Sequence, residues 1–219
     1  MRLTSYKPQK LARKSLTGNL RDAKLVVIAT EDTYAGKQYF ESKLFQSNRI
    51  KIEVIPTPNA EDKKEKTKSS PRAVEDRLRN FIDKYELLED DILCIMIDRD
   101  HWGNKMLSEI SQKTFRKKRR NIIFAVSNPC FELWLFLHVS EWDSNITTIT
   151  SKEMERKLRE KLGSYNKKNI NVDCFQGHIL EACSRAERMD KQPQDRWPQS
   201  IGTHVYRLIN ILKDLCPLE

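Results

Sequence analysis

Two acidic residues, Asp98 and Asp100, stand two positions apart directly after the apolar run 92–97. In an extended chain, side chains two residues apart point to the same side. At the carboxyl end of a buried strand they project into the crevice where open α/β sheets bind ligands. Carboxylate oxygens are the ligands that Mg²⁺ prefers, so this pair predicts a divalent metal site.

A third carboxylate, Glu31, follows the apolar run 24–29 in the same way. If the two strands are neighbours, Glu31, Asp98 and Asp100 converge at one edge of a sheet. Asp32 or the adjacent Thr33 could cap a helix beginning near Gly36, but capping leaves Glu31 unexplained. A glutamate at the end of an apolar strand in a basic protein is better explained by a cation.

Glu132 lies within the almost wholly apolar segment 131–138. A lone charge there would be costly, so the carboxylate must be paired, protonated or close to a metal. Two interpretations stay open, a metal or water-positioning residue and the partner of an arginine. His138, at the end of this segment, is expected to be a satisfied core or capping histidine, and Arg99 to be structural or an ion-pair partner.

Two other uses of the aspartates fit the sequence less well. Asp98, Asp100, Gly103 and Glu109 partly match a calcium-binding loop, but Trp102 occupies a ligand position and a strand precedes the motif, which excludes it. An aspartyl nucleophile at Asp98, as in phosphatases, ranks lowest because no companion lysine motif follows.

The 219-residue chain carries a formal charge of +9, with charged residues at 32% and hydrophobic residues at 38%. Such a charge favours an acidic partner, and nucleic acid is the leading candidate. The candidate phosphate contacts are the basic segment 1–22, a central cluster and two later lysines: Arg116, Lys117, Lys118, Arg119, Arg120, Lys167 and Lys168. His204 could also approach a phosphate, although each of these residues alone is more often surface chemistry.

The apolar patterns predict an α/β fold. Strands are expected at 24–29, 50–55, 92–97 and 121–126, with the alternating second one near the sheet edge. Helices are expected at 36–46, from 71 to about 85 and from 103 to about 114, which implies a mostly parallel sheet flanked by helices. Segment 56–71 is expected to be a mobile loop, and the stripes after 130 are helical. We therefore divide the chain into a basic arm (1–22), an α/β domain (23–139) and a helical part packed on it (140–219).

Five cysteines without a CxxC pair are typical of reduced core thiols in a cytosol. No signal peptide and no run of about 18 apolar residues is present in the sequence, so we expect a cytoplasmic protein without membrane attachment.

Three motifs together carry a family resemblance. Glu31 is followed by Tyr39-Phe40, then by Asp98-Arg99-Asp100, and then by Ser127-Asn128-Pro129-Cys130-Phe131-Glu132-Leu133-Trp134. Over about residues 20–215 the chain resembles the RloB-like family, whose core resembles the TOPRIM metal-binding domain. The family usually has glycine after the glutamate and a Thr-Glu pair before Tyr-Phe, where this chain has Asp32, Ala35 and Gly36.

The resemblance implies a TOPRIM-like sheet and a role for each carboxylate. Glu31 would be the general base or a metal ligand, Asp98 and Asp100 the metal-binding pair, and Glu132 would complete the site, with Mg²⁺ or Mn²⁺ as cofactor. It further implies an endonuclease that acts on transfer RNA, other RNA or DNA in bacterial anti-phage defence. An ABC or AAA-type ATPase is the expected partner, and a homo-oligomer is compatible with the resemblance. The alternative is a non-catalytic subunit that binds nucleic acid or the ATPase.

Overall fold

The computed structural model describes residues 23–58, 69–85, 87–100, 102–116 and 122–218. The predictions for the basic arm 1–22, for most of the loop 56–71 and for Lys117, Lys118, Arg119 and Arg120 lie outside these ranges. Arg116 ends a helix, but its side chain is not among those described. Within the described part, no helix has both the length and the apolar composition needed to cross a membrane.

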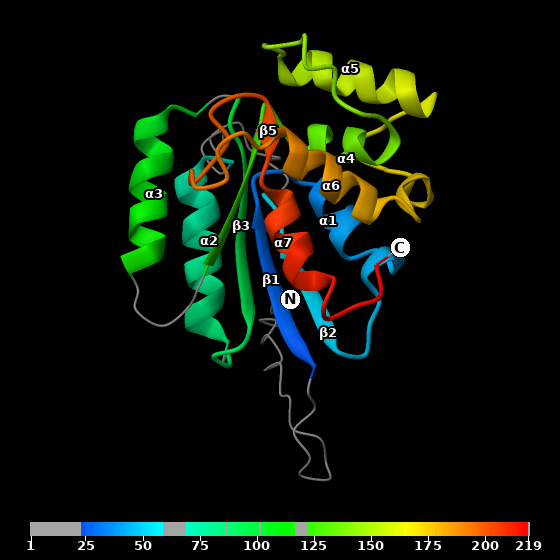
Figure 1. Ribbon diagram of the computed structural model, residues 1–219. Helices are drawn as coiled ribbons and strands as arrows, with labels where there is room; N and C mark the ends of the chain where they lie inside the picture. Colours follow the sequence, from blue (N-terminus) through cyan, green and yellow to red (C-terminus); the bar gives the residue numbers. More distant parts are fainter. Residues whose placement is uncertain (1–22, 59–68, 86, 101, 117–121, 219) are drawn as a thin grey trace, which may run out of the picture.

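The sheet has five strands in the order β2-β1-β3-β4-β5 (Figure 1). Four are parallel to one another, namely β1 (Lys24–Thr30), β2 (Ile50–Ile55), β3 (Ile92–Asp98) and β4 (Ile122–Asn128). The short β5 (Gly202–Thr203) pairs antiparallel with β4. The predicted α/β class is confirmed, and β2 lies at the expected edge. Because β1 and β3 are neighbours, Thr30 pairs with Met96 and the two acidic strand ends lie side by side.

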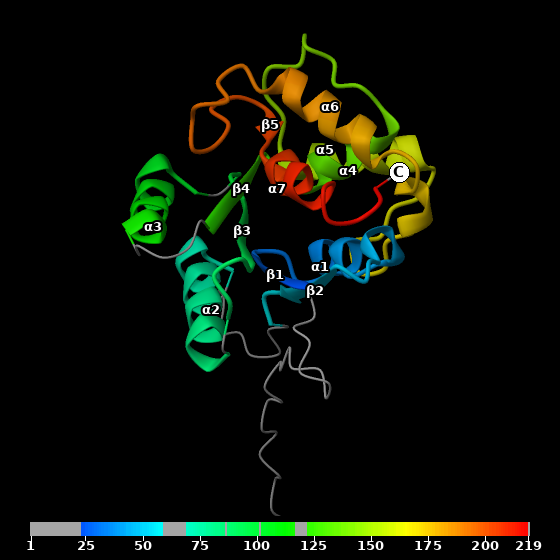
Figure 2. The ribbon, with the colours of Figure 1, turned by 60° about the horizontal axis from the view of Figure 1, so that its bottom comes forward.

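Helices cover both faces of this sheet (Figure 2). One face carries α2 (Pro71–Lys84) and α3 (Asn104–Arg116), and the other carries α1 (Ala35–Phe40), α4 (Glu132–Val139), α6 (Ile179–Met189) and α7 (Val205–Leu212). Helix α5 (Ser151–Leu162) packs on α4 from outside through Met154 and Leu158. Two 3-10 helices, η1 (Lys43–Phe45) and η3 (Val172–Phe175), complete the described elements.

The alternation of side chains along β1 divides the core into two layers. Val26 and Ile28 point toward α4, α6 and α7, whereas Leu25, Val27 and Ala29 point toward α2 and α3. Burial on both faces explains why the strands appear in the sequence as continuous apolar runs rather than as alternating ones.

Side-chain caps fix where two helices begin. The Ser70 hydroxyl accepts a hydrogen bond from the Ala73 N–H at 3.3 Å and Pro71 occupies the first helical turn, as the sequence predicted. Thr150 and Glu153 form a capping box that starts α5 next to the carboxyl ends of the strands.

Two expectations about the elements were wrong. The helix predicted at 36–46 ends at Phe40, because the Ser42 hydroxyl donates to the Tyr39 carbonyl oxygen and accepts from the Leu44 N–H, which starts the separate turn η1. The carboxyl-terminal third is not wholly helical, since it contributes β5 to the sheet. A strand of two residues is too short to produce a periodic pattern.

Candidate active site

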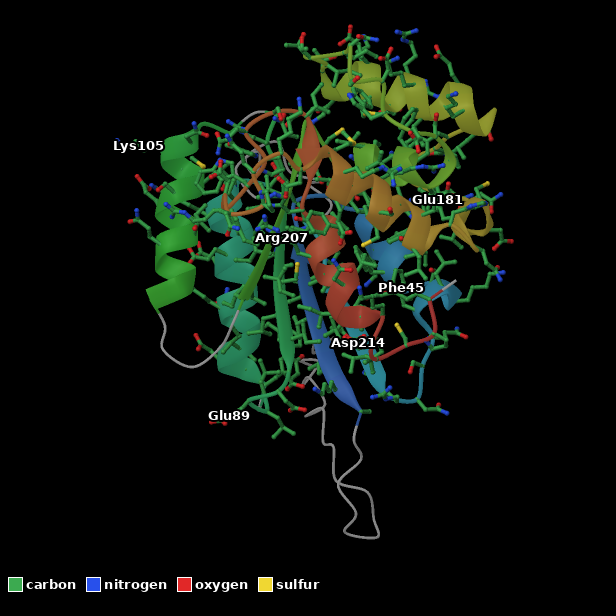
Figure 3. The ribbon with its side chains drawn as sticks, viewed as in Figure 1. Phe45, Glu89, Lys105, Glu181, Arg207 and Asp214 are labelled. Atoms are coloured by element: carbon green, nitrogen blue, oxygen red, sulfur yellow. The ribbon has the colours of Figure 1, made fainter. Side chains whose placement is uncertain are left out.

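The carboxyl ends of β1, β3 and β4 open into a cavity of about 900 Å³. This is the end of the molecule where Figure 3 shows Lys105, opposite the end that carries Glu89. The start of α5 and the segments around Lys167 and Gln199 form its other walls. Its acidic lining residues are Glu31, Asp32, Asp98, Asp100, Glu132 and Glu155.

Glu31 is held by two donors from the β3–α3 connection. The Trp102 indole N–H donates to Glu31 Oε1 at 2.8 Å, and the Asp98 backbone N–H donates to Oε2 at 3.2 Å. Burial raises the pKa of this carboxyl to about 7, although both hydrogen bonds favour the ionised form. Glu31 is therefore oriented toward β3, as the adjacency of the two strands predicted.

Asp98 connects the end of β3 with the start of α4. Its Oδ1 accepts a hydrogen bond from the Phe131 N–H at 2.9 Å. Burial raises the pKa of Asp98 well above its usual value; Lys167 opposes this shift, while Glu132 and Glu31 add to it. These mutual effects place Asp98 at the electrostatic centre of the acidic cluster.

Asp100 is more exposed and accepts a hydrogen bond from the Ser151 hydroxyl at the start of α5. The intervening Arg99 binds neutral groups: its guanidinium donates to the Pro198 carbonyl oxygen and, at 3.0 Å, to Asn104 Oδ1. Arg99 thus has the structural role that was expected, anchoring the segment before β5 beside the cavity.

Glu132 is paired with a lysine rather than with an arginine. Lys167 Nζ lies 3.1 Å from Glu132 Oε1, and the Tyr165 hydroxyl donates to the same oxygen at 3.1 Å. Burial by itself would raise the pKa of Glu132, but the charge of Lys167 and the hydrogen bonds from Lys167, Cys130 and the backbone together outweigh it, and the pKa is lowered. The pKa of Lys167 is raised for the reciprocal reason, since its neighbouring carboxylates outweigh the effect of burial.

The same ammonium reaches Asp32, at 3.2 Å from Oδ1. The other oxygen of Asp32 accepts hydrogen bonds from the Tyr34 and Gly36 N–H groups, at 2.9 Å and 3.1 Å. Asp32 thus satisfies an N–H group in the first turn of α1, as the capping interpretation expected, although the N-cap residue is Tyr34. A Cβ on Gly36 would lie 2.8 Å from the terminal methyl group of Met96, so a larger residue here would require that flexible side chain to shift.

Sequence reasoning missed four residues around these carboxylates, namely Trp102, Ser151, Tyr165 and Arg77. Arg77 of α2 donates to the Thr30 carbonyl oxygen at 2.8 Å, directly before Glu31. No local motif marks these residues. The one available signal was the position of Trp102 two residues after the Asp-x-Asp pair.

The other residues singled out in the sequence lie in different environments. His138 is buried and satisfied, with Nδ1 bonded to the Trp134 carbonyl oxygen and Nε2 to the Tyr39 hydroxyl, as expected. His204, which the sequence offered only as a residue that could approach a phosphate, does not lie at the surface. It is fully buried and lies 3.0 Å from Asp190 Oδ2, because β5 carries it beneath the surface. Lys168, in contrast, is exposed and lies over the Tyr34 ring.

The donor set suits a hard cation such as Mg²⁺, because it consists of carboxylate oxygens. Across residues 23–58, 69–85, 87–100, 102–116 and 122–218, however, no three or more His, Cys, Asp or Glu side chains are already arranged to hold a metal ion. Instead, donors of the chain itself, above all Lys167, Trp102 and Ser151, engage the acidic groups. The chemistry of the residues fits a metal, while their present arrangement is closed around an ammonium.

The model of one protein family, described as RloB-like protein, matches residues 26–212 of the chain. The chain belongs to the RloB-like family. The matched range contains the acidic strand ends, the segment that starts α4 and the Lys167 segment. Comparison with curated proteins and with solved structures returned no match.

Proposed function

We propose that this member of the RloB-like family is a Mg²⁺-dependent endonuclease that acts on nucleic acid in bacterial defence. One observation carries the proposal: carboxylates from the ends of β1 and β3 and the start of α4 face one cavity in a chain of charge +9. A basic protein with a concentrated acidic site suits a polyanionic substrate that is held by lysines and arginines and processed at a cation site.

Asp98, Asp100 and Glu132 would hold the cation, and Glu31 would serve as general base or as a further ligand. A bound Mg²⁺ would supply stabilisation of the negative charge that develops at the scissile phosphate. Glu31, oriented by Trp102 and the Asp98 N–H, would accept the proton of the attacking water. The water oxygen bonds to phosphorus, the bond to the leaving oxygen breaks, and a solvent proton neutralises that oxygen.

The test is a cleavage assay with RNA, including transfer RNA, and with DNA, in Mg²⁺ and in EDTA. We expect cleavage of at least one of these substrates in Mg²⁺ alone, and at least about a hundredfold loss in Glu31→Gln and in Asp98→Asn. Both substitutions keep the size of the side chain and an oxygen acceptor, so they change charge rather than packing.

Glu89→Gln is the matched control. Glu89 is exposed and lies at the opposite end of the sheet (Figure 3), so its loss of charge should leave cleavage unchanged. Cleavage that persists in EDTA, or in both site variants, would contradict the proposal.

The closed arrangement of the site favours a second candidate, a non-catalytic subunit that binds nucleic acid or an ATPase. Each of Glu31, Asp100 and Glu132 is engaged by a donor from the chain itself. This candidate predicts stable association with an ABC or AAA-type ATPase, and no divalent-dependent cleavage even when that partner and ATP are present.

A further inference from the structure

Lys167 occupies the middle of the acidic site. Its ammonium lies 3.1 Å from Glu132 Oε1 and 3.2 Å from Asp32 Oδ1, and it also interacts electrostatically with Asp98 and Glu31. An ammonium that touches several carboxylates at once takes the position that an added cation would need.

The negative charge around Lys167 exceeds what one ammonium can balance. Two carboxylates pair with it directly, those of Asp32 and Glu132, and the carboxyl groups of Glu31 and Asp98, whose pKa values burial raises, lie close enough to interact with it. Because two of these side chains are almost fully enclosed, with exposed fractions of 6% for Asp32 and 3% for Glu132, water screens the repulsion poorly. The cluster therefore favours a cation of higher charge than the one it holds.

The backbone that carries Lys167 is fixed, whereas its ammonium can leave. Gln38 of α1 donates to the Lys167 carbonyl oxygen at 3.3 Å and accepts from the Ile170 N–H at 3.0 Å, which clamps the segment. The Lys167 side chain is itself 36% exposed, so it can move toward solvent on its four-carbon stem without rearrangement of the fold.

We propose that Lys167 is the resident counter-ion of the acidic site and that a divalent cation binds by displacing its ammonium, so that Lys167 sets the metal concentration at which the protein loads. This inference rests on the proposed function, since it concerns the same site. It also accounts for a donor set that suits Mg²⁺ although, in the part of the chain that the structure describes, no three His, Cys, Asp or Glu side chains are arranged to hold a metal ion.

Displacement has a measurable consequence for affinity. The apparent affinity of a ligand falls in proportion to the fraction of molecules whose site is open, so an ammonium seated nine times in ten weakens binding about tenfold. Lys167→Met should therefore bind metal about tenfold more tightly than the wild type. Lys167→Arg should bind it more weakly, because a guanidinium forms a more rigid, two-pronged pair with carboxylates.

The experiment is a titration of the full chain with Mn²⁺ in the absence of nucleic acid. Calorimetry and electron paramagnetic resonance measure the binding of the metal. Lys168→Met is the matched control, because it removes the same charge from the neighbouring, exposed residue and should leave the Kd of Mn²⁺ unchanged. Lys167→Arg keeps the charge of the cluster, so it provides a result even if Lys167→Met does not fold.

Equal Mn²⁺ affinity in the wild type and the Lys167 variants, or weaker binding by Lys167→Met, would overturn the displacement while leaving a metal-dependent nuclease intact. If no protein binds Mn²⁺, both the displacement and the metal requirement of the proposed function fail. Tighter binding by Lys167→Met combined with weaker binding by Lys167→Arg would support the displacement, whatever the substrate proves to be.

Discussion

Replacing Glu31 by Gln should increase the stability of the metal-free protein at pH 8 while it abolishes activity. The pKa of Glu31 is raised by burial from 4.5 to about 7, so the folded protein holds this proton more tightly than the unfolded chain does. Stability is therefore lost as the pH rises from 4.5 to 7, and the full cost of the ionised carboxylate is present above pH 7.

The magnitude follows from the displacement of the pKa. The rise in the pKa of Glu31 from 4.5 to about 7 lowers the free energy of unfolding by roughly 3 kcal/mol at pH 8 and by roughly 1 kcal/mol at pH 5. Glu31 retains some contact with solvent, which reduces the difference between the two pH values to roughly 2 kcal/mol. The amide of Gln opposes the Asp98 N–H with a second donor, but this cost of about 1 kcal/mol is the same at both pH values.

Urea unfolding in EDTA at pH 5 and pH 8 measures this difference. The free energy of unfolding of Glu31→Gln, relative to the wild type, should be higher at pH 8 than at pH 5 by roughly 2 kcal/mol. Glu89→Gln, at the far end of the sheet, should show no such dependence on pH. A Glu31→Gln protein with the same relative stability at both pH values would refute the argument that burial of the ionised Glu31 carboxylate opposes folding.

Two further predictions concern buried polar groups. Replacing His138 by Gln should reduce the loss of stability between pH 8 and pH 5 by roughly 2 kcal/mol, because burial lowers the pKa of His138 to about 3 and the unfolded chain takes up the proton first as the pH falls below 6.5. His178→Gln, at an exposed position, is the control. A His138→Gln protein that loses as much stability between pH 8 and pH 5 as the wild type would contradict this prediction. Tyr165→Phe should lower the free energy of unfolding by about 1–2 kcal/mol through loss of the hydrogen bond to Glu132, measured in urea. Tyr85→Phe, directly after α2, should change it by less than about 0.5 kcal/mol, and equal effects of the two would disprove the contribution of that bond.

Local patterns were sufficient for the sheet and for the position of its acidic edge. Strands that are buried on both faces need uninterrupted apolar side chains, so β1, β3 and β4 are visible in the sequence, and the acidic residues that end such runs mark the edge of the sheet. The same reasoning required Glu132 to be paired, protonated or close to a metal, because an apolar segment cannot bury an isolated charge. The roles in metal binding and catalysis stay predictions.

The identity of the partners depended on the path of the chain. Lys167 and Lys168 are adjacent and chemically identical, yet one enters the acidic cluster and the other lies exposed over Tyr34. Gln38 clamps the segment that carries them to α1, through a contact over 129 residues of sequence that no periodicity encodes. Composition and spacing thus specified which groups needed neutralising, whereas only the long-range packing of helices and loops on the sheet determined which side chain neutralises them.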